Sequence, residues 1–432
     1  MTKVALVVLA VSPLAMAQEP RPTSEEKAVE LALAASNRVR EAQAAVASRQ
    51  AQVQALTSGR KLQIVLTAQA TQRSSVPEFR LPAALGDRLL FPSLESTATV
   101  SGNLAYNLDL AGVVRQSLAA ARERTTATEA QLQQVRLEVA LEARLAFWQA
   151  AQALAFVAVA ERELARCEQT LTDTQALLEA GLATEADLLT ARAERERARV
   201  GVLAARSEAG LRLAALRSLL GLSEANEVRV QPADGLPPSP PPLSELLPQA
   251  KENRPELAAL RHLVDASEGE SRAVKATERP AVSLAVQYDW ANPNPRYVPL
   301  EPHWHGSWQA AIVAAWKLYD GGEAAAKARA AAAEAEVSRA RLAEVQRLVE
   351  LEVEKAQKRL GNALAVAHAS QAAYQAALAR ENAVRESYSA GIARLADLLA
   401  AQEALARAEF QAENSRIEAW IAHAQLLRSI GQ

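Results

Sequence analysis

The residue types that usually perform catalysis are sparse in this sequence of 432 residues. It contains no glycine-rich phosphate loop, no nucleophile elbow and no histidine-rich metal spacing. His303 and His305 form the only close histidine pair, and they fall in a proline-rich stretch, where an exposed loop explains them better than a set of ligands. The single cysteine, Cys167, falls in a helical pattern and has no partner for a disulfide. We therefore expect no enzyme activity, no cofactor and no bound metal.

One polar motif occurs twice, 210 positions apart. In the first copy Gly181 precedes Asp187 by six residues, and in the second copy Gly391 precedes Asp397 by the same distance. An alanine-rich helical pattern runs up to each glycine, the residue that most readily takes the left-handed conformation closing a helix. An Asp-Leu-Leu run then opens the next amphipathic stretch. The motif predicts two helical turns and indicates a tandem duplication.

The rest of the chain fits a duplicated plan. We predict a first structural repeat over residues 18–230, a proline-rich linker over 231–248 and a second repeat over 249–432. Each repeat is predicted to contain a helix, two strands separated by a loop, a very long helix and a final helix. The clearest long helix covers residues 112–180, because that run has neither proline nor glycine after Gly112. The first helix is predicted to be continuous from residue 24 to residue 58.

Composition supports long, closely packed helices. Hydrophobic residues make up 50% of the chain but aromatic residues only 4%, so most of the apolar content is alanine and leucine. The formal net charge is −2, which gives no reason to expect nucleic-acid binding or a polybasic membrane patch.

The N-terminus has the features of a secretory signal. A charged start is followed by an apolar run and by Ala15-Met16-Ala17, which predicts a signal peptide over residues 1–17. A membrane anchor is the alternative, but the apolar run is shorter than the roughly 20 residues that a spanning helix needs.

Four segments alternate apolar and polar residues over about eleven positions each. They lie at about 61–72, 95–108, 281–290 and 306–318. Their length and alternation are typical of transmembrane β-strands, although a small soluble sheet with one buried face would alternate in the same way. Aromatic residues near the strand ends favour the membrane interpretation, because interfacial girdles are built from them; they are Tyr106, Tyr288, Trp290, Trp308 and Trp316. Four strands are too few to close a barrel, so membrane insertion would require an oligomer.

The whole predicted mature chain resembles the TolC-like outer-membrane efflux proteins. The resemblance rests on the duplicated order of helices and strands, on the strand exit from Trp316 to Gly322, and on the two glycine turns. It implies a mainly α fold with membrane β-structure: a homotrimer whose twelve-stranded β-barrel in the outer membrane continues as a periplasmic α-helical barrel. It also implies a periplasmic adaptor and an inner-membrane pump as partners, with outer-membrane lipid around the barrel.

The same resemblance implies site residues at the helix turns. A periplasmic gate would contain Asp187, Tyr388, Arg394 and Asp397, and the adaptor would dock on the turns at Gly181, Leu182, Gly391 and Ile392. This chain departs from the family pattern at two places: Ala393 stands where an arginine is usual, and Ala400 replaces a second aspartate. One acidic ring is therefore expected where two occur elsewhere.

The function that these features favour is a passive exit duct of a tripartite efflux or type I secretion system. The alternative is a periplasmic coiled-coil scaffold or adaptor that forms no channel. An adaptor has no need of strands with a lipid-compatible face, so the strands discriminate between the two.

Overall fold

The computed structural model describes residues 21–86, 89–91, 93–223, 228–232, 234–298 and 300–432. The predicted signal peptide lies outside them. The chain forms two compact units. The sheet unit comprises residues 42–132 and 256–345, and the helical unit comprises residues up to 41, 133–255 and 346–432. Each unit draws on both predicted repeats, so the units and the repeats divide the chain differently.

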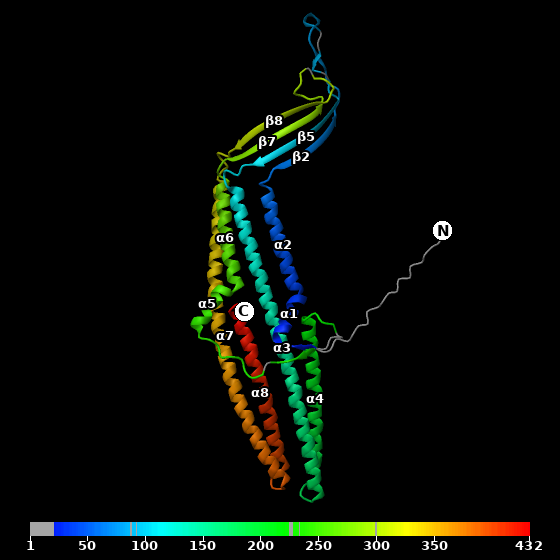
Figure 1. Ribbon diagram of the computed structural model, residues 1–432, viewed down its shortest axis with the longest axis vertical. Helices are drawn as coiled ribbons and strands as arrows, with labels where there is room; N and C mark the ends of the chain where they lie inside the picture. Colours follow the sequence, from blue (N-terminus) through cyan, green and yellow to red (C-terminus); the bar gives the residue numbers. More distant parts are fainter. Residues whose placement is uncertain (1–20, 87–88, 92, 224–227, 233, 299) are drawn as a thin grey trace, which may run out of the picture. The chain divides into compact units, whose positions relative to one another are not determined.

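The sheet unit contains one antiparallel sheet of four strands (Figure 1). Its order is β2-β5-β7-β8, so the pairing of β5 with β7 joins the first half of the chain to the second. The strands span β2 Gln63–Gln72, β5 Ser96–Asn107, β7 Ala281–Asn292 and β8 His305–Ala315.

Two strand ends differ from the sequence prediction. β8 ends at Ala315 rather than at residue 318, because its neighbour β7 begins at Ala281, directly after Pro280, and Ala281 pairs with Ala315. Proline lacks the N–H group that would extend the ladder. At its other end β7 continues to Asn292, which pairs with Ala98 of β5. The loop predicted between the first two strands holds a short hairpin of β3 (Phe79–Arg80) and β4 (Leu89–Phe91), with a 3-10 turn at Ala83–Leu85.

Helices adjoin the same end of all four strands. α2 (Asn37–Ser58) leads into β2 and α6 (Pro255–Ala276) leads into β7, while α3 (Val113–Glu179) follows β5 and α7 (Glu323–Ser389) follows β8. Small residues let α3 and α6 approach closely: a Cβ added at Gly269 would lie 3.1 Å from the Cβ of Ala120. The chain has few aromatic residues and many small ones, and the small residues allow this close helix packing.

The helical unit holds the remaining parts of α3 and α7 with four further helices. These are α1 Glu25–Ala35, α4 Glu185–Leu219, α5 Leu243–Asn253 and α8 Leu395–Ser429. A short parallel ladder pairs β1 (Arg21–Thr23) with β6 (Val228–Val230). The core of this unit is mostly alanine, leucine and valine, with Phe147 and Trp148 among its largest buried side chains. Trp148 of α3 stacks on Trp420 of α8 at 4.9 Å, and the indole N–H of Trp148 donates to Glu25 of α1.

One helix of the described residues, α3, is long and apolar enough in part to cross a membrane. Length and composition are weak evidence for that, because the core helix of a bundle passes the same test. In α3 the side chains of Phe147 and Trp148 are fully buried among protein atoms, as expected of a packed helix.

The helix predicted over residues 24–58 is two helices, because the chain is extended at Ser36, with ψ of 120°. The Ser36 hydroxyl accepts a hydrogen bond from the N–H of Val39 and so starts α2, as serine commonly does at a helix N-terminus. The second half has the same break at Arg254, between α5 and α6, with ψ of 116°. Arg254 is buried there: its Nε donates to the carbonyl of Ser429, and its Nη2 lies 2.7 Å from Glu352.

The proline-rich linker is shorter than predicted, because α5 begins at Leu243 and includes Pro248. Pro242 precedes the first helical residue, and Leu246 and Ala250, spaced by four, bury one face of the helix. At the end of this segment, the helical spacing of apolar residues therefore indicates the structure better than the proline content does.

Element lengths repeat closely along the chain. α3 and α7 have 67 residues each, α4 and α8 have 35 each, α1 and α5 have 11 each, and α2 and α6 have 22 each. The elements before the strands start 218 residues apart, as Glu25 and Leu243 do, whereas those after the strands start 210 apart, as Val113 and Glu323 do. The loops between paired strands differ in length and account for the change in offset.

Candidate functional site

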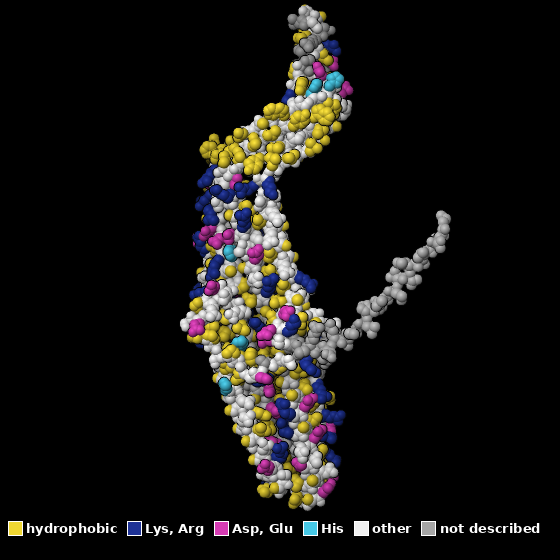
Figure 2. Space-filling view, viewed as in Figure 1, with side chains coloured by type: hydrophobic (Ala, Val, Ile, Leu, Met, Phe, Trp, Pro, Cys, Tyr) yellow, Lys and Arg dark blue, Asp and Glu magenta, His cyan; other side chains and the backbone are white. Residues whose placement is uncertain are grey.

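One face of the sheet is apolar across all four strands. Cross-strand rows place apolar side chains side by side, for example Ile64, Leu104, Val286 and Ala310. Ile64, Leu66, Trp308 and Ile312 are each more than 70% exposed. Figure 2 shows hydrophobic side chains concentrated over the sheet. So large an exposed apolar surface marks contact with lipid or with another protein.

The opposite face of the sheet is polar and internally bonded. Ser101 and Gln287 both donate to Asp289, at 2.7 and 2.8 Å. The Gln309 amide donates to Gln287, and Arg296, in the loop before β8, donates to Gln309. Because side chains alternate along a strand, this network and the apolar rows lie on opposite sides of the same four strands. A sheet with these two faces can separate an apolar phase from water.

The predicted girdle residues lie near the strand ends. Tyr288, Trp290 and Trp308 are near the loop end of the sheet, where Trp290 also contacts Trp304 with ring centroids 5.0 Å apart. The Tyr288 side chain packs over Gly306, where a Cβ would come within 2.3 Å of the tyrosine oxygen, so a larger residue there would displace the Tyr288 ring. Tyr106 and Trp316 lie at the helix end, and the Trp316 N–H donates to the carbonyl of Glu278. Their membership of an interfacial girdle remains a prediction.

The two glycine turns have the same backbone structure. Gly181 and Gly391 have φ of 75° and 72°, and the N–H group of the following residue donates to the carbonyl five residues earlier in both turns. This is the Schellman arrangement that ends helices. Leu182 and Ile392 are exposed at these turns. The turns are neighbours, since a Cβ at Gly391 would lie 3.5 Å from Leu182.

Both aspartates of the motif cap a helix. Asp187 accepts hydrogen bonds from the hydroxyl and the N–H of Thr184, at 2.6 and 3.0 Å, and the Thr184 hydroxyl accepts from the N–H of Asp187. The hydrogen bond from the Thr184 hydroxyl lowers the pKa of Asp187 most, and the bond from the Thr184 N–H lowers it further. Asp397 accepts a longer bond of 3.4 Å from the N–H of Arg394. An arginine side chain has no acceptor, so only half of this second capping box can form.

Tyr388 is buried inside the subunit. Its hydroxyl lies 2.7 Å from that of Thr174 on α3, and its ring packs with Leu395 and Leu398. Burial raises the pKa of Tyr388, against the opposing effect of the Thr174 hydrogen bond. The bond ties the end of α7 to the end of α3, so Tyr388 can hold the two turns together.

Sequence reasoning missed a series of polar contacts between α3 and α8. Glu409 is buried and accepts from Arg162 and Arg166, and the buried Gln402 donates to Thr170 at 2.8 Å. Their signal in the sequence is weak, because polar residues on a helix are usually solvated. These contacts fix the register of α8 against α3 above the turns.

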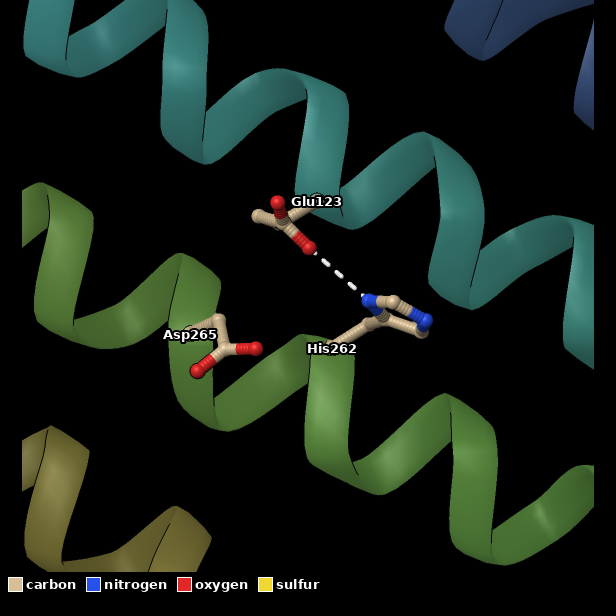
Figure 3. Close-up of side chains that lie close together, drawn as sticks. All are labelled: Glu123, His262 and Asp265. Carbon is tan, nitrogen blue, oxygen red and sulfur yellow. Dashed lines mark hydrogen bonds and ion pairs between the residues drawn. The ribbon is translucent and has the colours of Figure 1, made fainter.

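A second missed cluster lies in the sheet unit, between α3 and α6 (Figure 3). His262 Nδ1 lies 2.8 Å from Glu123 Oε2, and Asp265 brings a further carboxylate, so that all three potential ligand atoms lie within 4.8 Å of one another. The hydrogen bond in this cluster joins a helix of the first half of the chain to one of the second half.

Comparison with protein families gives one match that covers most of the chain. The family described as outer membrane efflux protein matches residues 28–222 and 246–432. The two matched segments correspond to the two sets of helices and strands. No individual curated protein sequence matches the chain significantly.

Solved structures share the fold. The outer membrane protein VceC from Vibrio cholerae is 20% identical, with a TM-score of 0.76 over 94% of this chain and 96% of that one. The CmeC outer membrane channel of Campylobacter jejuni is 16% identical, with a TM-score of 0.77 over 94% and 85%. The MtrE outer membrane channel of Neisseria gonorrhoeae, solved in an open state, is 20% identical, with a TM-score of 0.76 over 94% and 88%.

Proposed function

We propose that three copies of this chain, which belongs to the outer membrane efflux protein family, together form the wall of one channel. The chain is an outer-membrane efflux channel with a large periplasmic helical part, and it is not an enzyme. The alternative of a periplasmic scaffold or adaptor without a channel is wrong, because the family consists of outer-membrane channels.

The trimer is proposed because the four-stranded sheet is open at both edges. In the part of the chain that the structure describes, β2 and β8 each pair with a single strand of the sheet, so both edges have free hydrogen-bonding groups. Such groups cannot remain unpaired in lipid, and four strands cannot close on themselves. If β8 of one copy pairs with β2 of the next, three copies give twelve strands, with the apolar face toward lipid and the Asp289 network toward the lumen.

The turns at Gly181 and Gly391 are the proposed docking site for a periplasmic adaptor that also joins an inner-membrane pump. Leu182 and Ile392 support this role, because both expose most of their apolar side chain at neighbouring turns. Apolar side chains at a rigid turn are suitable anchors for a protein partner.

The gate is proposed at the same turns, where three copies of Asp397 would approach the channel axis with Asp187 and Arg394 nearby. The Tyr388 to Thr174 hydrogen bond would hold each pair of turns inward. Three like charges in a narrow ring would attract cations and repel anions.

The trimer is tested by native mass spectrometry of detergent-extracted protein, combined with electrophoresis before and after heating. A trimer mass and a band that moves on heating are expected. A monomer that is extracted by carbonate would contradict the proposal. Single-channel currents in planar bilayers would then show whether the trimer conducts.

A further inference from the structure

The net charge of −2 conceals a concentration of cations at the helix end of the sheet. The four segments that link strands to helices, residues 57–62, 108–116, 272–280 and 316–329, carry nine Lys or Arg and four Asp or Glu, a net charge of +5. The segments at the loop end, residues 73–95 and 293–304, carry four basic and four acidic residues, a net charge of zero. The sheet therefore has one basic end and one neutral end.

Most of these cations are available for binding. The structure describes all nine of these cations, and the side chains of six of them make no hydrogen bond or ion pair within the described residues. All six are exposed: Arg60, Lys61, Arg115, Lys275, Arg279 and Arg329. The acidic residues are mostly engaged elsewhere. Asp109 accepts from the backbone of α3, and Asp320 accepts from the N–H groups of Gly322 and Ala324. Glu323 pairs with Lys327 and Lys317.

Helix dipoles explain only part of this pattern. Arg60, Lys61, Lys275 and Arg279 lie at or beyond the C-terminal ends of α2 and α6, where cations are favourable in any protein. Arg115 lies in the first turn of α3, where the dipole opposes a positive charge, and Arg329 lies in the second turn of α7, where no dipole favours it. Lys317 and Lys327 pair with Glu323, so Arg115 and Arg329 are the cations that neither a favourable dipole nor an acidic partner explains.

We propose that these nine cations form a basic belt that binds the headgroups of anionic phospholipids in the leaflet facing the periplasm. The proposal rests on the sheet crossing the outer membrane, as argued above. In that position the helix end of the sheet meets the periplasmic leaflet, and Figure 2 shows Lys and Arg side chains directly beside the hydrophobic band. Phosphodiester groups at this depth lie within the roughly 8 Å over which charges act at physiological salt. The belt would fix the depth of the channel through charge, together with its apolar face.

The test compares lipid retention by a belt variant and by a matched control. The belt variant carries Arg60→Gln, Lys61→Gln, Lys275→Gln and Arg279→Gln. The control carries Arg192→Gln, Lys355→Gln, Arg359→Gln and Arg380→Gln, four exposed cations of the helical unit. Each protein is equilibrated with detergent micelles containing equal amounts of phosphatidylglycerol and phosphatidylcholine, and the lipids that remain bound to the purified protein are quantified.

The unchanged protein and the control are expected to retain phosphatidylglycerol about tenfold over phosphatidylcholine, and the belt variant is expected to lose most of that preference. The preference should fall in high salt and should withstand inorganic phosphate at the same ionic strength, which separates lipid from free phosphate. Equal retention of both lipids by the unchanged protein, or equal loss in the control, would overturn the belt. Single-channel currents are recorded for the same proteins: a conducting channel without lipid preference refutes the belt alone, whereas protein that never enters a bilayer refutes the proposed function.

Discussion

At the residue scale, the aspartate at the second turn has two roles that can be separated. Asp397 caps α8 through the N–H of Arg394, a neutral task that an asparagine oxygen can also perform. Its proposed role in the gate requires the charge.

We predict that Asp397→Asn lowers the cation selectivity of the open channel and weakens block by multivalent cations from the periplasmic side, with little loss of stability. Planar-bilayer reversal potentials measure the selectivity. Glu185→Gln, which removes an exposed charge from the first turn of α4, is the control and should change both properties less. Unchanged selectivity and block in Asp397→Asn would leave capping as the only role of this carboxylate.

The lone cysteine gives a prediction with a defined pH dependence. Burial of Cys167, assisted by the charges of Glu163 and Glu194, raises the pKa of its thiol to about 11. The thiol therefore stays protonated at neutral pH, and the reactive thiolate forms only as the pH approaches 11.

We expect Cys167 in the folded protein to react with iodoacetamide at least a hundredfold more slowly than a free cysteine peptide at pH 8, because an ordinary thiol has a pKa of about 8.5. The rate should rise with pH well above the range in which the peptide saturates. Mass spectrometry of the alkylated protein measures it, and unfolding in denaturant should restore the peptide rate. A folded-state rate equal to that of the peptide would show that the thiol is not perturbed.

At the scale of single elements, the two helical turns depend on glycine because their backbone takes a positive φ. Gly391 has φ of 72°, and the left-handed conformation costs a residue with a Cβ about 1 to 2 kcal/mol. Gly361, in the middle of α7, has ordinary helical geometry and no atom within 4 Å of an added Cβ.

We predict opposite effects of the same substitution at these two glycines. Gly391→Ala should lower the thermal stability of the helical unit, whereas Gly361→Ala should raise it, since alanine is favoured over glycine in a helix by about 1 kcal/mol. Thermal unfolding followed by circular dichroism compares them. A stabilised Gly391→Ala protein would exclude the left-handed turn.

Adjacent residues of β8 test which face of the sheet meets lipid. Ala310 pairs with Val286 in an apolar row, and Ala311 pairs with Ala285 on the opposite face. Both alanines are exposed in the single chain, so burial within one copy does not distinguish them.

Ala310→Arg should impair membrane assembly, because an arginine on the lipid face costs about 2 to 4 kcal/mol near the middle of the bilayer. Ala311→Arg should assemble normally and reduce cation conductance from inside the lumen. The heat-modifiable trimer in membrane extracts measures assembly. Equal assembly of the two variants would rule out the assigned faces.

At the scale of the whole molecule, tryptophans report where the bilayer lies. Trp308 and Trp316 lie at opposite ends of the sheet, while Trp148 and Trp420 stack in the helical unit. The chain has six tryptophans, so single-tryptophan variants are needed, with phenylalanine at the other five positions.

We predict that quenchers attached near lipid headgroups reduce the fluorescence of Trp308 and Trp316, and that quenchers deep in the acyl chains act on them less. Trp148 should respond to neither, because it is buried in the periplasmic helical part. Reconstituted vesicles provide the measurement. Strong quenching of Trp148 by either probe would place the helical unit in the bilayer and contradict the channel topology.

The sequence by itself determined the elements with a regular pattern. The long helix before Gly181 is predictable because its run contains no glycine or proline to interrupt it, and a helix pairs the backbone N–H and C=O groups within the run itself. The four strands are predictable because alternation with a period of two fits only extended chain. The glycine turns followed from the need for positive φ, and the duplicated motif linked the two halves of the chain.

Only the tertiary structure decided where elements break and which polar residues meet. The break at Arg254, between α5 and α6, depends on a contact with a distant part of the chain, because the Arg254 side chain donates to the carbonyl of Ser429. Tyr388 was expected at the gate with the aspartates, yet its burial beside Thr174 appears only when α3 and α7 are placed together. The basic belt was hidden for the same reason: its cations come from four segments far apart in the sequence, and a net charge sums them with acids that lie elsewhere. Local patterns fix local backbone, whereas contacts between distant residues depend on how the elements pack.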